Sequence, residues 1–322
     1  MKVGIIGAGL IARKMAYTLN QMEEAQAYAI ASRSIAKATA FAQEFTMEKA
    51  YGSYEELVQD PQVELIYIAT PHSFHYDHIK LALTHDKAVL CEKAFTANKQ
   101  QAQEVIELAH ERKLLLAEAI WTRYVPMRKI LDDVITSGII GKVHSLTANL
   151  GYVIDHVPRL FDPHLAGGAL LDVGVYPINF ALMVLGHQIE RYDSSVTFTE
   201  TGVDAQNSMT FTYKDGSIAM LHSTQLASTD RRGMIFGNKG YIEVQNINNP
   251  QMIRVFDTNY ELIKEIEQPP QITGFEYQVQ ACIEAIHSKA IECPQQPHEE
   301  ILRVMTIMDQ FRAQWGLRYP FE

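Results

Sequence analysis

Short apolar runs alternate with helical patterns through the first third of this 322-residue chain. The runs Val3–Ile6, Val63–Ala69 and Ala88–Glu92 are mostly apolar rather than alternating in polarity, which is typical of strands buried on both faces. Helical patterns cover residues 10–22 and 99–112. This order predicts an α/β fold with a doubly wound, Rossmann-type parallel sheet. Because such sheets bind ligands at the carboxyl ends of their strands, the residues after each strand are the candidate site.

The pattern changes after about residue 120, where β-rich runs such as Val143–Ile154 begin. Asp215-Gly216 and Asn238–Gly240 are hairpin signals, and successive hairpins build an antiparallel sheet. We therefore expect residues 1–119 to form the Rossmann domain. Residues 120–322 are expected to form an α+β domain with an open, mostly antiparallel sheet.

The net charge and the cysteine content restrict the partners and the cellular compartment that we expect for this protein. Lys and Arg number 28 against 38 Asp and Glu, a net charge of −10, which argues against nucleic acid and anionic membranes as partners. The three cysteines, Cys91, Cys282 and Cys293, form no disulfide framework or zinc pattern, as in a reducing cytoplasm. We expect no signal peptide and no run of about 18 apolar residues that could span a membrane. The predicted location is cytoplasmic.

A glycine-rich turn, Gly7-Ala8-Gly9-Leu10-Ile11-Ala12, follows the first strand as G-x-G-x-x-A. Gly7 allows the tight turn, and Gly9 lets a pyrophosphate approach the backbone. The helix that starts at Leu10 and Ile11 offers free N–H groups to phosphates. A plain tight turn and the glycine loop of a methyltransferase are the alternatives. The surrounding strand–helix–strand unit favours dinucleotide binding.

The end of the second strand indicates which dinucleotide is bound. NAD-binding units carry an acidic residue at this place for the ribose 2′-OH, but here it holds Ser32, followed by Arg33. A hydroxyl and a guanidinium would bind a 2′-phosphate, which an acidic residue would repel. The alternative is that Arg33 is a solvated cation. We predict NADP as the cofactor, with NAD as the second choice.

The residues after the strand at 63–69 are assigned to the cofactor side of the cleft, namely Thr70, Pro71, His72 and His75. Together with His78, the two histidines are spaced i, i+3, i+6, which is not the i, i+4 spacing of a typical metal motif. We therefore predict no metal. Helix capping or a ribose contact is the expected role of His72.

Glu92-Lys93-Ala94 ends the next strand, at the same edge of the sheet. A lysine placed there can hold a substrate hydroxyl or stabilise an alkoxide. On this segment alone, a surface lysine is an equally good interpretation of Lys93.

The segment from Gly167 to Pro177 contains Asp172 and Tyr176 at i, i+4, so on a helix they share one face. A tyrosine phenol has an unperturbed pKa of about 10, which a nearby ammonium lowers toward the working range. Alcohol oxidation needs such a base, because a proton must leave the hydroxyl as hydride leaves carbon. The alternative is a buried tyrosine whose hydroxyl bonds to Asp172.

Three motifs together resemble one family over nearly the whole chain. Gly7-Ala8-Gly9, Glu92-Lys93 and the segment from Gly167 to Tyr176 are similar to those of the glucose–fructose oxidoreductase and inositol dehydrogenase (Gfo/Idh/MocA) family. Within it, Glu118–Pro126 and the Ser32-Arg33 pair look most like the branch of dimeric dihydrodiol dehydrogenases and NADP-dependent D-xylose dehydrogenases.

The resemblance implies roles that the residues alone do not establish. Lys93 and Tyr176 would be catalytic, with Asp172 supporting them. Trp121 and Arg123 would lie along the nicotinamide half of the cofactor, whereas from the residues alone they are interface or core residues. The implied cofactor contacts also include Glu92, and the implied substrate contacts are Lys93, Trp121, Asp172 and Tyr176.

One residue departs from the family pattern, in which proline follows the lysine. Here Ala94 takes that place. A proline can fix a cis bond that alanine adopts only at a large energetic cost. Either the bond is trans and Lys93 points differently, or it is cis here as well.

The predicted function is hydride transfer between NADP(H) and a CH–OH or carbonyl group of a sugar, a cyclic diol or a related small polyol. The alternative is a catalytically silent nucleotide-binding regulator on the same fold. The loop residues His156, Arg159, Phe161 and Asp162 either line the substrate side or are solvated. The resemblance also implies a homodimer formed through the sheet of the second domain.

Overall fold

The computed structural model describes all residues from Met1 to Glu322. The chain divides into two compact units. The first unit comprises residues 1–124 and 271–306, and the second comprises 125–270 and 307–322. The chain leaves the first unit close to the domain boundary predicted near 120. Residues 271–306, however, which were expected in the second domain, belong to the first unit, so both units are discontinuous in sequence.

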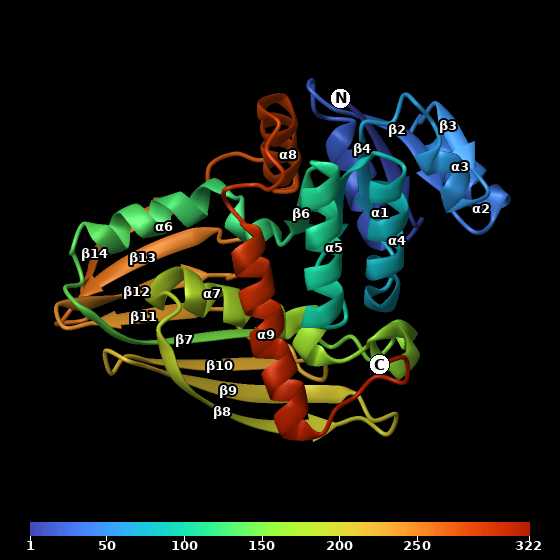
Figure 1. The fold of residues 1–322 in the computed structure, drawn as a ribbon. Coiled ribbons are helices and arrows are strands. Elements are labelled where there is room, and N and C mark those ends of the chain that lie inside the picture. The colour runs from blue at the N-terminus through green and yellow to red at the C-terminus, as the bar shows by residue number, and fades with distance from the viewer. The chain divides into compact units, whose positions relative to one another are not determined.

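The first unit is built on a six-stranded, wholly parallel sheet with strand order β3-β2-β1-β4-β5-β6 (Figure 1). This is the Rossmann order, whose direction reverses between β1 and β4. The predicted fold class is confirmed. The elements in chain order are β1 (Lys2–Ile6), α1 (Leu10–Leu19), β2 (Gln26–Ala31), α2 (Ile35–Glu44), β3 (Lys49–Tyr51), α3 (Tyr54–Val58), β4 (Leu65–Ile68), the 3₁₀ turn η1 (His72–Phe74), α4 (His75–Thr84), β5 (Ala88–Glu92), α5 (Lys99–Arg112), β6 (Leu116–Ala119), the 3₁₀ turn η2 (Trp121–Arg123) and α8 (Glu276–Ser288).

Local signals account for these elements. Strands β4 and β5 are buried along their whole length, as expected for a sheet covered on both faces. Ser53 caps the N-terminus of α3 by accepting a hydrogen bond from the Glu56 amide. Strand β6 includes Glu118, whose buried carboxylate accepts a hydrogen bond from the Gln296 side chain.

The second unit is built on an eight-stranded sheet with order β14-β13-β12-β11-β7-β10-β9-β8. Only β7 and β10 pair in parallel, so the prediction of a mostly antiparallel sheet is confirmed. Its elements are α6 (Pro126–Thr136), β7 (Val143–Gly151), the 3₁₀ turns η3 (Pro158–Phe161) and η4 (Pro163–Leu165), the π turn η5 (Leu170–Gly174), α7 (Val175–Leu185), β8 (Ile189–Phe198), β9 (Asp204–Tyr213), β10 (Ile218–Thr224), β11 (Gly233–Gly237), β12 (Gly240–Gln245), β13 (Met252–Asp257), β14 (Leu262–Glu267) and the C-terminal part of α9 (His298–Trp315).

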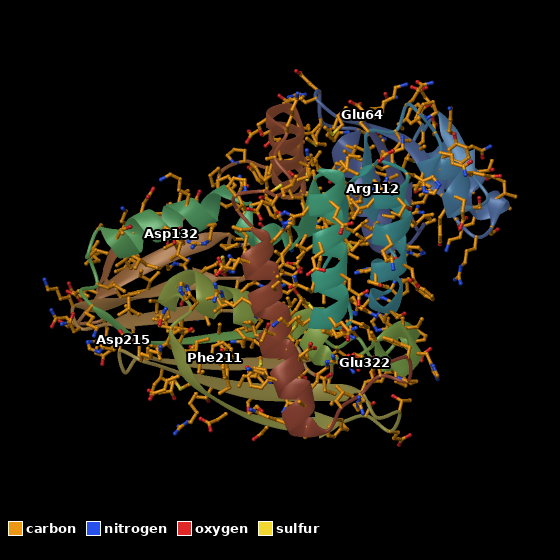
Figure 2. The ribbon with its side chains drawn as sticks, viewed as in Figure 1. Glu64, Arg112, Asp132, Phe211, Asp215 and Glu322 are labelled. Carbon is orange, nitrogen blue, oxygen red and sulfur yellow. The ribbon has the colours of Figure 1, made fainter.

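The two faces of this sheet differ. Helix α7 packs on β7 and β10, and Phe211 of β9, labelled in Figure 2, stacks on Phe311 of α9. On β10 itself, Ile218 and Met220 point the other way and are exposed. The alternation therefore leaves apolar side chains on the face that no helix of this unit covers.

One helical segment bears on the expectation that no run of the chain is long and apolar enough to span a membrane. Pro163–Leu185 is long and apolar enough to cross a bilayer by length and composition, so the expectation that no such run exists was wrong. Of its most apolar window, 78% is buried inside the protein, and core helices of soluble proteins pass the same test.

Candidate dinucleotide site and catalytic residues

The glycine turn between β1 and α1 requires glycine at its first position. Gly7 has a φ of +96°, and a Cβ there would lie 2.8 Å from the Ala69 carbonyl oxygen. The Gly7 amide donates to the Ala31 carbonyl, which ties the turn to β2. Both the backbone angle and the close approach to the next strand of the sheet exclude a larger residue.

Gly9 is glycine for a different reason. Its φ of −91° is open to any residue, and no atom lies within 4 Å of the position that a Cβ would take. It precedes the first turn of α1, where no acidic side chain occurs and Leu10 is 86% exposed. Open space beside unpaired helix N–H groups fits an anionic pyrophosphate. The residues present therefore fit a dinucleotide.

Ser32 and Arg33 follow β2 at the same edge of the sheet. Ser32 is buried, and its Oγ accepts a 3.4 Å hydrogen bond from the Ser34 amide, whereas Arg33 is exposed. Burial is the main cause that lowers the pKa of His78. The charges of His75 and of the Arg33 guanidinium lower it further. That pKa falls to about 4, so His78 is neutral at neutral pH.

The three histidines after β4 serve separate contacts. His75 is fully buried, with Nδ1 2.8 Å from the Ala94 carbonyl oxygen and Nε2 2.8 Å from that of Thr70. The Nδ1 atom of His78 lies 3.0 Å from Thr70 Oγ1, and the buried His72 ring meets the His75 ring edge-on. No group of three potential ligands in the structure is arranged for a metal ion. His75 instead ties the loop after β4 to the loop after β5.

Glu92 and Lys93 lie at the end of β5. Glu92 is buried and accepts a hydrogen bond from the Tyr67 hydroxyl, and burial raises the pKa of its carboxyl group. Lys93 is half-buried, and the Lys93–Ala94 bond is cis. Of the two alternatives that the sequence left open, the structure has the cis bond despite the absence of proline.

Trp121 and Arg123 lie in η2, directly after β6. Arg123 Nη2 is 3.2 Å from Glu300 Oε2 in an ion pair whose arginine side chain is only 9% exposed. Arg123 is therefore a core residue, as one interpretation of the sequence allowed. A cofactor contact by the same side chain stays a prediction.

The surroundings of Trp121 include residues that sequence reasoning missed. Its indole meets the Phe275 ring edge-on at 4.9 Å, and Lys14 Nζ lies 4.1 Å from the centroid of each ring. Burial lowers the pKa of Lys14, against the raising influence of Glu92 and Glu276. Lys14 lies in the helix that follows the glycine turn, so that helix also holds Trp121 through a cation–π contact. The partners are distant in sequence, and no local signal could have identified them.

The segment before α8 lies against the same indole. The Glu276 carboxylate accepts hydrogen bonds from the amides of Ile272, Thr273 and Gly274 at 2.6–3.1 Å. Gly274 has a φ of +90°, and a Cβ there would lie 2.9 Å from Trp121 Cζ3. Backbone and ring are therefore in close contact at this position.

In the second unit, Asp172 lies in the π turn η5 and Tyr176 at the start of α7, and both are buried. Asp172 Oδ1 is 3.5 Å from Arg159 Nη2, which gives the loop residue Arg159 a defined partner. The expected i, i+4 relation assumed a regular α-helix. The structure instead places Asp172 in a π turn with i→i+5 bonding, and the shared face of Asp172 and Tyr176 stays a prediction.

Family models match both parts of the chain. The model described as an oxidoreductase family with an NAD-binding Rossmann fold covers residues 1–119, and the Gfo/Idh/MocA C-terminal domain covers residues 129–243. The chain belongs to the Gfo/Idh/MocA oxidoreductase family. The predicted family and the oxidoreductase class are therefore confirmed.

Relatives and solved structures within this family extend over the full chain. The trans-1,2-dihydrobenzene-1,2-diol dehydrogenases of Mus musculus and Homo sapiens are each 34% identical to it, covering 99% of this chain and 98% of theirs. KijD10, a 3-ketoreductase from Actinomadura kijaniata solved in complex with NADP and TDP-benzene, is 26% identical, with a TM-score of 0.88 and 97% of each chain covered. The aldose-aldose oxidoreductase of Caulobacter crescentus, at 18% identity, shares the fold with a TM-score of 0.87 over 99% of this chain and 98% of its own.

These matches support an enzyme over the silent regulator. This Gfo/Idh/MocA member is an oxidoreductase with a Rossmann domain of the NAD-binding kind. The roles of its individual residues stay predictions, and they are taken up below.

Proposed function

We propose that this oxidoreductase transfers hydride between NADP(H) and a CH–OH or carbonyl carbon of a cyclic diol, a sugar or a related small polyol. The observation that carries the proposal is the open space at Gly9, which fits a pyrophosphate at the start of α1. The chemistry is supported by Tyr176, a buried phenol next to a π turn that holds Asp172. The relatives named as dihydrodiol dehydrogenases, and KijD10 with bound NADP, support the substrate and cofactor classes.

In the proposed mechanism, the turn at Gly7 and Gly9 would hold the pyrophosphate of NADP(H), which when bound would supply a hydride acceptor or donor. Tyr176 Oη takes the proton of the substrate hydroxyl as the C–H bond breaks, and it returns that proton in the reductive direction. The Lys93 ammonium is proposed to hold the substrate oxygen. Asp172, paired with Arg159, orients the tyrosine. Two electrons and one proton leave the CH–OH carbon as hydride, and one proton leaves the oxygen, so a carbonyl results.

The activity itself is tested by following the absorbance of reduced nicotinamide. Purified protein is mixed with NADP⁺ and a trans-dihydrodiol, D-xylose, other aldoses or an acyclic polyol. We expect turnover with at least one cyclic diol or sugar. Tight NADP binding without turnover in either direction, when the corresponding carbonyl compounds and NADPH are also supplied, would contradict the proposal and favour the regulator.

The cofactor preference rests on Arg33. Replacing Arg33 by alanine is expected to weaken NADP about 10- to 100-fold and NAD far less, since charge-assisted hydrogen bonds contribute about 1.5–3 kcal/mol each. Dissociation constants from nicotinamide fluorescence of NADPH and NADH provide the comparison. Lys37→Ala, an exposed cation on α2, is the matched control. Equal weakening of both cofactors would show that Arg33 does not bind the 2′-phosphate.

We also propose that a second copy of the chain covers the open face of the eight-stranded sheet. Phe198, Ile218 and Met220 are exposed on β8 and β10, which lie on either side of β9 in one sheet. Ile218→Glu combined with Met220→Glu is expected to shift the protein from dimer to monomer in light scattering. Leu262→Glu, an equally apolar and exposed position on the opposite edge strand β14, is the control. A wild-type monomer at micromolar concentration would refute the dimer.

The cellular location is also a proposal. We infer a reducing compartment such as the cytoplasm, because Cys91, Cys282 and Cys293 are all free and buried. We expect the protein, isolated from its native cell and then denatured, to retain three titratable thiols.

A further inference from the structure

A buried hydrogen-bond network lies beneath the π turn η5. Asp204, the first residue of β9, is fully buried, and its Oδ2 accepts hydrogen bonds from the Leu170 amide at 2.7 Å and from Asn207 Nδ2 at 3.0 Å. Asn207 Oδ1 in turn accepts from Ser223 Oγ at 2.8 Å. The network therefore runs from β10 through β9 to the first residue of the π turn.

The second carboxylate oxygen of Asp204 faces backbone. Oδ1 is buried and has no hydrogen-bond partner, and a Cβ at Gly168 would overlap it. Gly168 has a φ of +118°, so glycine is required there for its backbone conformation as well as for space. A buried carboxylate oxygen without a hydrogen-bond partner is unfavourable for stability.

The network touches both ends of the π turn. Leu170, whose amide bonds to Asp204, begins the turn, and Gly174 ends it, with Ser223 Oγ 2.9 Å from the position of a Gly174 Cβ. Asp172 lies between these two ends, and Tyr176 is the second residue of α7. A π turn is an irregular element, so its geometry depends on contacts such as these more than that of an α-helix does.

A separate contact holds the backbone just before the turn. The Tyr319 hydroxyl donates to the Gly167 carbonyl at 2.9 Å, and the Arg312 guanidinium lies 4.8 Å from the centroid of the Tyr319 ring. Arg312 is itself held by Glu322 and Asp309. The Leu170 amide, the Asn207 side chain and the Arg312 cation all act on the Asp204 carboxylate. Burial, and then Asp204, raises the pKa of the Tyr319 hydroxyl, which stays neutral.

We propose that Asp204 is a positioning residue, whose carboxylate fixes the π turn and thereby places Asp172 and Tyr176 for the reaction. This inference rests on the proposed function, in which Tyr176 moves the proton. The ionised carboxylate accepts from Leu170 and Asn207 at once. An asparagine can keep both bonds through its carbonyl oxygen, but it removes the negative charge and puts its NH₂ group, a buried donor without an acceptor, in the place of Oδ1 against Gly168.

Asp204→Asn is the central test, with the exposed hairpin residue Asp215→Asn as the control. We expect kcat to fall about tenfold or more, while the dissociation constant of NADPH stays at the wild-type value. Hydrogen exchange of the segment 168–174 is expected to become faster in Asp204→Asn and not in Asp215→Asn. Unchanged kcat and unchanged exchange in a folded Asp204→Asn protein would overturn the proposal.

The pH profile separates positioning from a general loss of structure. Burial raises the pKa of Asp204 to about 7, against the lowering influence of its hydrogen bonds and of Arg312. The wild-type kcat should therefore fall as pH drops through that value, and this limb should be absent in Asp204→Asn. The same limb in both proteins would contradict the role of Asp204.

A double mutant distinguishes this proposal from the mechanism on which it rests. In a Tyr176→Phe background, Asp204→Asn is expected to lower kcat no further, because it acts through the tyrosine. A full additional loss would overturn the positioning role. If Tyr176→Phe alone keeps wild-type turnover, the proposed mechanism fails, while the exchange measurement still tests the π turn. Should Asp204→Asn not fold, Ser223→Ala weakens the same network from its far end, and a smaller fall in kcat is expected.

Discussion

Replacing Tyr176 by phenylalanine is expected to lower kcat by about 10²–10⁴, because general acid–base catalysis by a positioned side chain is worth that factor. The ring of Tyr176 is 7% exposed, and removing its hydroxyl leaves the packing in place. The dissociation constant of NADPH should therefore stay near the wild-type value. Steady-state kinetics with the best substrate, together with a fluorescence titration of the cofactor, measure both quantities.

Tyr241→Phe is the matched control for this change. Tyr241 lies in β12, and its ring stacks on Phe256 of β13, so its hydroxyl is not assigned to the site. We expect wild-type kinetics from it. If Tyr176→Phe turns over as fast as Tyr241→Phe, then Tyr176 is a buried structural tyrosine, as one interpretation of the sequence allowed.

Gly9→Val is expected to weaken dinucleotide binding about a hundredfold or more while leaving the melting temperature near that of the wild type. The φ of Gly9 is accessible to valine, and the space around its Cβ position holds no protein atom. The added side chain would therefore enter the volume that a pyrophosphate requires and disturb little else. Calorimetric titration with NADP⁺ and a thermal melt give the two readouts.

Gly7→Ala, two residues earlier, should behave in the opposite way. Its φ of +96° and the Ala69 carbonyl 2.8 Å from the added Cβ place the strain within the protein, so stability is expected to fall by about 1–3 kcal/mol. Comparing Gly9→Val with Gly7→Ala therefore tests whether the open space at Gly9 holds the cofactor phosphates. Wild-type NADP affinity in a folded Gly9→Val protein would mean that the cofactor phosphates lie elsewhere.

Much of the fold could be predicted from local patterns. Strand β5 and helix α5 have the bounds that the sequence predicted, because an apolar run and a capped amphipathic helix are local signals. The three-residue strand β3 was missed, since Lys49-Ala50-Tyr51 is short and only half-buried. The membership of residues 271–306 in the first unit was also missed, because no local signal shows where a distant segment returns.

In the candidate site, too, local patterns predicted some features, whereas contacts between distant segments could not be predicted. The order of strands and turns was enough to place Gly7, Ser32 and Lys93 after strands of one parallel sheet. It could not show that Arg123 pairs with Glu300, which is 177 residues away along the chain. Nor could it show that Asp172 lies in a π turn, because such a turn is specified by its contacts rather than by a residue pattern.

The sequence by itself determined the two sheets, the glycine turn and the residue types offered for chemistry, since hydrophobic period and turn chemistry act within a few residues. The tertiary structure decided which partner satisfies each buried polar group. Asp204 bonds to the Leu170 amide, and Lys14 lies against Trp121 and Phe275. Such pairings arise only when distant segments pack together and exclude water, because a buried polar group must then find its partner within the protein.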